Sequence, residues 1–193
     1  MDFSKFFTSK RIILILIVLI VLFGACDMKS KYNTMVNMNE DIKNKWAEID
    51  NQLKRRYDLI PNLVNTVKGY ARHEKEVFTQ IAEARSKLAG ATTINEKAKA
   101  ASSMESAIGR LLVIVENYPQ LKADSHFRAL MDELAGTENR LAVARKRYND
   151  AVAQYNKYIK MFPTNIFANM FNFKEGEYFK IEESEKANPK VEF

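Results

Sequence analysis

Apolar residues recur at helical spacing along most of this chain. Between residues 33 and 57 they fall every three or four positions, and the same spacing returns in 60–88, 94–117 and 124–161. A repeat near 3.6 residues is typical of helices that bury one face. No stretch of useful length alternates as a strand would. The pattern predicts an all-α fold, an antiparallel up-and-down four-helix bundle over residues 32–161.

The junction between the first two predicted helices contains Pro61. Proline favours the first turn of a helix, which predicts a break between helices 33–57 and 60–88. The apolar repeat keeps almost the same phase across Pro61, which instead favours one helix kinked there. We expect two helices, with the single kinked helix as the alternative.

The N-terminal segment 1–26 is typical of a membrane signal or anchor. A short basic stretch precedes an apolar run from Ile12 to Cys26, which as a helix spans about 22 Å against about 30 Å of bilayer hydrocarbon. Gly24 and Ala25 stand directly before Cys26, as in a lipoprotein signal whose cysteine is lipidated. The alternative is an uncleaved transmembrane helix. Both predict membrane lipid as a partner.

Charge and composition argue against several kinds of partner and site. The net charge is +6, spread along the helices without a basic cluster, so we expect no nucleic-acid partner. Lysine and arginine are nearly balanced on the two sides of the apolar run, and the signal-like design favours an extracytoplasmic body. One cysteine and two histidines predict no metal site, and we expect no cofactor.

The C-terminal residues 162–193 differ from the body. They hold seven aromatic side chains, and Pro163 and Gly176 interrupt helical structure. The composition predicts an irregular tail that packs its rings on the bundle. The alternative is a surface that faces a partner or the membrane.

Polar residues are dense around Pro61. Asp58 and Asn62 are expected to cap free backbone N–H groups there, and Arg55 or Arg56 to meet the carbonyl end of the first helix. The alternative is a binding site at this junction.

A second polar set follows one line of the last long helix. Glu138, Arg145, Asn149 and Asn156 are spaced by 7, 4 and 7 residues, so they lie on one stripe bordering the apolar face. Arg85 likewise falls on the apolar side of its helix. Charges at such positions are costly unless paired, so we expect a polar network that fixes helix register. The alternative is a polar groove for a ligand or partner.

Several ordered strings of residues resemble the LemA family of bacterial membrane-associated proteins. They include Arg55 to Val64 (RRYDLIPNLV), His73-Glu74, Tyr118 to Ala123 (YPQLKA), Glu138 to Arg140 and Ala144 to Asn149 (ARKRYN). The resemblance covers about 32–180. It implies an N-terminal anchor and a four-helix bundle, and it implies no established biochemical activity.

The sequence also lacks the motifs of common enzymes. It has no phosphate-binding loop, no nucleophile elbow, no Cys–His pair, and no second histidine at zinc-protease spacing after His73. We therefore expect a non-enzymatic interaction or organising module at the bacterial membrane, with an unidentified protein partner. The alternative is a small-ligand sensor, or a subunit of an envelope enzyme complex, that uses the polar stripe.

Overall fold

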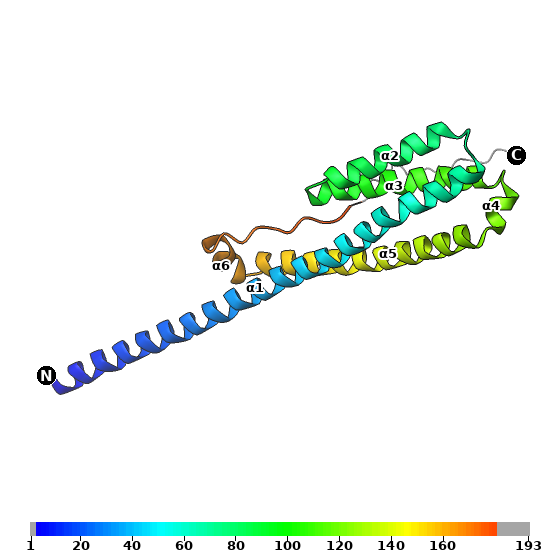
Figure 1. Ribbon diagram of the computed structural model, residues 1–193. Helices are drawn as coiled ribbons and strands as arrows, with labels where there is room; N and C mark the ends of the chain where they lie inside the picture. Colours follow the sequence, from blue (N-terminus) through cyan, green and yellow to red (C-terminus); the bar gives the residue numbers. More distant parts are fainter. Residues whose placement is uncertain (1–2, 181–193) are drawn as a thin grey trace, which may run out of the picture. The chain divides into compact units, whose positions relative to one another are not determined.

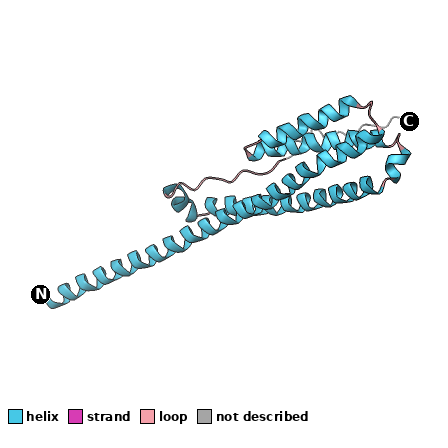
Figure 2. Ribbon diagram, in the orientation of Figure 1, coloured by secondary structure: helices cyan, strands magenta, loops and turns pink. Residues whose placement is uncertain are grey.

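The described part of the chain consists of helices and the loops that connect them, with no strand. The computed structural model describes residues 3–180, except for the side chains of 3–13, 17 and 20–25 (Figures 1 and 2). Its helices are α1 (Phe3–Tyr70), α2 (Lys75–Gly90), α3 (Ile94–Val115), α4 (Pro119–Ala123), α5 (Ser125–Lys160) and α6 (Thr164–Met170). The expected all-α class is confirmed. Part of the predicted apolar anchor and residues 181–193 of the predicted tail lie outside the described residues.

Helix α1 does not break where the sequence predicts. It continues through Pro61 to Tyr70, so the expected boundary between residues 57 and 60 is wrong. Proline has no N–H to donate to the carbonyl four residues earlier, that of Tyr57. The Nε of Arg85 donates to this carbonyl at 3.4 Å. A side chain of α2 thus supplies the donor that the proline lacks, which the local sequence does not reveal.

The chain divides into two compact units, each built from separate stretches of sequence. The smaller comprises residues 1–42 and 151–176, and the larger comprises 43–150 with 177–193. In the larger unit one apolar cluster draws buried side chains from α1, α2, α3, α4 and α5, among them Leu63, Ile81, Leu111, Leu121 and Leu134. The same unit contains the two charged networks and the groove described below.

The smaller unit packs the end of α5, α6 and the segment after α6 against α1. A Cβ at Gly176 would lie 3.4 Å from Val152 Cγ1 and 3.5 Å from Ile42 Cδ1, which is van der Waals contact, so the chain at this point packs directly on both helices. The Tyr32 ring lies 4.9 Å from that of Phe171. Helix α6 was not expected in the predicted irregular tail. Thr164 and Ala168, four residues apart, are its buried side chains.

Side chains cap the starts of α3 and α5. Thr93 and Glu96 form a capping box at α3, in which each side chain accepts a backbone N–H of the other residue. These bonds, together with those from Thr92, lower the pKa of Glu96 to about 2. Asp124 accepts the N–H of Phe127 at 2.8 Å and the Tyr70 hydroxyl at 3.0 Å, which lowers the Asp124 pKa.

Within the described residues, no helix has a stretch both long and apolar enough to cross a bilayer.

The capping box predicts a pH-dependent stability. The Glu96 carboxylate has its ordinary pKa of 4.5 when unfolded and about 2 when folded, so its contribution is present above pH 4.5 and is lost as the pH falls towards 2. Glu96→Gln should therefore be less stable than the parent at neutral pH. The difference in stability between the two proteins should shrink as the pH falls from 4.5 towards 2. Thermal melts of both proteins in mild detergent, followed by circular dichroism, check this, and a gap independent of pH would contradict it.

Candidate functional site

The polar residues of the larger unit form two networks that join α1 to α5. In the first, Glu138 on α5 forms ion pairs with Arg56 of α1 and with Arg145 of α5. The Nη2 of Arg145 lies 2.6 Å from Glu138 Oε1. Arg56 is 5% exposed, so its charge has almost no contact with water. One carboxylate between two guanidinium groups supplies the pairing that buried charges require.

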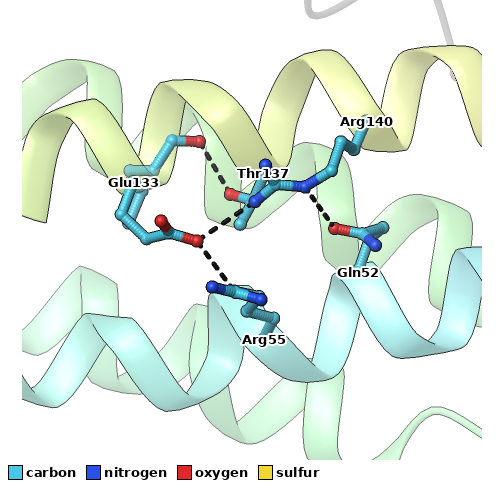
Figure 3. A network of polar contacts seen from close by, with 6 residues as sticks. Gln52, Arg55, Glu133, Thr137 and Arg140 are labelled. Carbon is cyan, nitrogen blue, oxygen red and sulfur yellow. Dashed lines mark hydrogen bonds and ion pairs between the residues drawn. The ribbon is translucent and has the colours of Figure 1, made fainter.

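The second network lies nearer the surface, one helical turn away. Arg55 Nε lies 2.7 Å from Glu133 Oε1, and Arg140 Nη2 lies 3.1 Å from the same oxygen (Figure 3). Arg140 also donates to Gln52 Oε1 at 3.2 Å. Figure 3 shows these side chains converging from both helices, beside Thr137, whose hydroxyl donates to the Leu134 carbonyl. Exposed pairs of this kind contribute little stability.

Arg55 and Arg56 thus pair with carboxylates of α5. The expectation that they meet the end of a first helix is wrong, because α1 does not end there. Asp58 and Asn62 are exposed inside α1, so their expected capping roles are wrong for the same reason. His73 is exposed in the turn between α1 and α2. Among the described residues no group of three or more histidine, cysteine or acidic side chains is placed to hold a metal.

The two asparagines of the predicted stripe bind the backbone of the segment after α6. In the larger unit the Asn149 amide donates to the Phe179 carbonyl at 3.0 Å and accepts the Phe179 N–H at 2.9 Å. In the smaller unit Asn156 does the same with Gly176, at 3.0 and 2.8 Å.

Phe179 and its neighbours pack beside Trp46. The Trp46 ring lies 6.1 Å from Phe179 and 5.6 Å from Tyr148. Tyr148 donates its hydroxyl to the Glu177 carbonyl at 2.7 Å, and burial, with the nearby Glu177 charge, raises its pKa to about 12. Tyr148 therefore stays protonated at physiological pH and serves as a donor. The four polar side chains of the stripe are thus engaged by contacts within the chain.

A groove follows the facing sides of α1 and α2 in the larger unit. Its first hollow, of about 440 Å³, is lined by Tyr57, Pro61, Lys68, Phe78 and Arg85, among others. A second hollow, of about 650 Å³, continues from it, because both are lined by Lys68, Phe78 and Ala82. Arg72 and Lys75 line the second hollow. We call this the α1–α2 groove.

The groove combines cations with an apolar floor. Its described lining residues include Lys68, Arg72, Lys75 and Arg85 and no acidic side chain. The Arg85 guanidinium carbon lies 3.9 Å from the centre of the Tyr57 ring, and Lys68 Nζ lies 5.2 Å from that of Phe78. These stacking contacts orient the cations without neutralising their charge.

The apolar repeat of the sequence points to Arg85 but not to the other three cations of the groove. Lys68 lies in the last turn of α1 and Arg72 in the turn that follows, but their spacing of four residues is one that would place two charges on one face of a continuing helix. A search for charge periodicity, in addition to apolar periodicity, would have found this pair. It would not have found Lys75, which lies beyond the turn.

The first network, around Glu138, predicts how much stability three variants lose relative to one another. Glu138→Gln leaves Arg56 and Arg145 without their shared anion, so it should lower the free energy of unfolding by about 3–5 kcal/mol. Arg145→Gln keeps the Arg56–Glu138 pair, so its cost should be about 1–2 kcal/mol. Glu133→Gln in the exposed network is the control, at less than about 1 kcal/mol. Urea unfolding midpoints measure all three, and equal losses would refute the ranking.

The asparagine contacts predict a local effect. Asn149→Ala leaves the N–H and carbonyl of Phe179, whose residue is 3% exposed, without their partners. The loss of stability should be about 1–3 kcal/mol. Deuterium exchange at residues 177–180 should quicken. Asn139→Ala, at an exposed position of the same helix, should change stability by less than about 0.5 kcal/mol. Unchanged exchange in Asn149→Ala would show that the amide does not hold this segment.

The chain resembles several known proteins along most of its length. It is 27% identical to magnetosome protein MamQ 2 of Paramagnetospirillum magneticum, over 87% of this chain and 71% of that protein. It is also 27% identical to protein LemA of Metamycoplasma hominis, over 81% of this chain and 72% of that protein. The sequence pattern of the LemA family matches residues 45–193. The chain therefore belongs to the LemA family.

Proposed function

We propose that this protein is a non-enzymatic interaction module, anchored to the bacterial membrane, whose α1–α2 groove receives an acidic segment of another envelope protein. The observation that carries the proposal is the groove itself, which places Lys68, Arg72, Lys75 and Arg85 over an apolar floor with no acid among its described lining residues. Such a surface suits a segment with both carboxylates and apolar side chains.

The arrangement of polar groups supports binding in preference to catalysis. Glu138 and Glu133 are engaged by arginines, and Asn149 and Asn156 hold the backbone. Catalysis requires titratable groups that converge on a space where a substrate can bind. The groove offers cations and aromatic rings, which recognise charge and shape without supplying a base.

The proposal includes the four-helix bundle and the N-terminal anchor. Support for the bundle is the apolar cluster, to which α1, α2, α3 and α5 all contribute. Support for the anchor is the apolar run 12–26, in which Leu14, Ile15 and Leu19 are more than half exposed to solvent. The run acts either as a membrane helix or as a signal that ends at the lipidated Cys26. The body lies outside the cytoplasm.

A second candidate function is small-ligand sensing. A hollow of about 340 Å³ is lined by Asp50, Leu53, Tyr57, Lys97 and their neighbours, a size within the range of small-molecule sites. Lys97 forms an ion pair with Asp50 and lies 5.6 Å from the centre of the Trp46 ring. A ligand with a carboxylate or phosphate would compete for Lys97. Thermal shifts with a panel of metabolites distinguish this function from partner binding.

Site-specific photocrosslinking tests the groove. A photoreactive amino acid at Ala82, an exposed lining residue, should capture a partner in native membranes, whereas one at the exposed Ser106 of α3 should not. Arg72→Glu with Lys75→Glu should remove the crosslink because it reverses the charge that attracts the partner. Mass spectrometry should map the captured site to an acidic segment. Equal capture at Ser106, or capture unaffected by the charge reversal, would contradict the proposal.

A further inference from the structure

Exposed apolar side chains gather around α6 in the smaller unit. They are Phe162, 80% exposed, then Met170, Ile166 and Met161 at 57, 55 and 52%, and Tyr32 and Phe171 at 40 and 39%. Single exposed apolar residues are ordinary on protein surfaces, but a contiguous set marks a surface that something covers. We call this set the α6 patch.

Local contacts show that the patch is contiguous. Ile166 and Met170 are four residues apart and share one face of α6. The N–H of Asn165 bonds to the Met161 carbonyl at 2.9 Å, which folds residues 161–162 back onto the start of α6. Phe171 follows Met170 directly and meets the Tyr32 ring edge to face. The six side chains thus come from α1, from α6 and from the residues on either side of α6.

The position of the patch along α1 points to the covering surface. After α6 the chain runs along α1, from Tyr32, which contacts Phe171, to Ile42, which lies beside Gly176. Helix α6 is therefore at the Tyr32 end of this unit. Tyr32 follows Cys26 by six residues of continuous helix, about 9 Å. Whether Cys26 ends a membrane helix or carries lipid, the membrane boundary lies close to it, and the headgroup layer extends several ångströms beyond the hydrocarbon.

The charges near the patch suit an anionic membrane surface. Residues 26–34 and 157–176 contain five lysines and two acidic residues. Lys29 and Lys174 are exposed. Lysines beside aromatic and apolar side chains form the usual combination at the interface between headgroups and acyl chains.

From these observations we infer that the α6 patch is a second membrane contact, in which Phe162, Ile166 and Met170 enter the headgroup layer beside the anchor. The inference rests on the membrane attachment proposed above, and it adds a surface that would hold the smaller unit against the lipid. A single anchor point leaves a protein free to tilt, whereas a second contact limits its orientation.

Depth-dependent fluorescence quenching tests the inference on the full chain. Phe162→Trp and Ile166→Trp each add a tryptophan to the patch, and Val113→Trp, at a position 66% exposed on α3, is the matched control. Each protein is reconstituted into vesicles of phosphatidylcholine and phosphatidylglycerol with or without brominated acyl chains. The native Trp46 is present in all of them, so the parent protein in the same vesicles supplies the background.

If the α6 patch enters the headgroup layer, brominated lipid should quench the fluorescence of the tryptophan introduced in Phe162→Trp and Ile166→Trp. The fluorescence of the tryptophan introduced in Val113→Trp should not change. Proteins that float with the vesicles but show no added quenching would overturn the α6 contact and leave the proposed anchor intact. Emission shifted to the blue without quenching would show that protein, such as a second copy of this chain, covers the patch. A chain that does not float with vesicles would remove the proposed attachment and this inference together.

Discussion

The larger unit depends on the burial of one arginine. Arg56 is buried in the last third of α1, where its charge is stable only beside an anion. Glu138 supplies that anion and accepts Arg145 as well, so a single carboxylate sets how α1 and α5 face each other. Apolar side chains alone would tolerate several registers between two helices. A shared ion pair selects one, because any slip leaves a buried charge without its partner.

A side chain from another helix also explains why α1 continues through Pro61. The carbonyl that proline leaves free is met by Arg85, whose guanidinium also stacks on Tyr57. One side chain thereby bonds the free carbonyl of α1 and contributes one of the four cations of the α1–α2 groove. Because Arg85 both bonds the backbone of α1 and lines the groove, a substitution of Arg85 is expected to alter α1 as well as the charge of the groove.

The two compact units have different surface chemistry. The α1–α2 groove is cationic over an apolar floor and suits an acidic protein segment. The α6 patch is aromatic and apolar with lysines near it, and it suits lipid. If both proposals hold, the groove would bind a partner while the α6 patch contacts the membrane.

Sequence alone determined the helical class and the bounds of α3 and α5 closely, because 3.6-residue periodicity and capping signals are local. It also identified Glu138, Arg145, Asn149 and Asn156 as one stripe, since helical geometry follows from spacing. Their partners came only from the tertiary structure: Arg56 is distant in sequence, and Asn149 binds the backbone of Phe179, which has no residue-specific signature. The continuity of α1 likewise required a donor from another helix, and no local rule contains that contact.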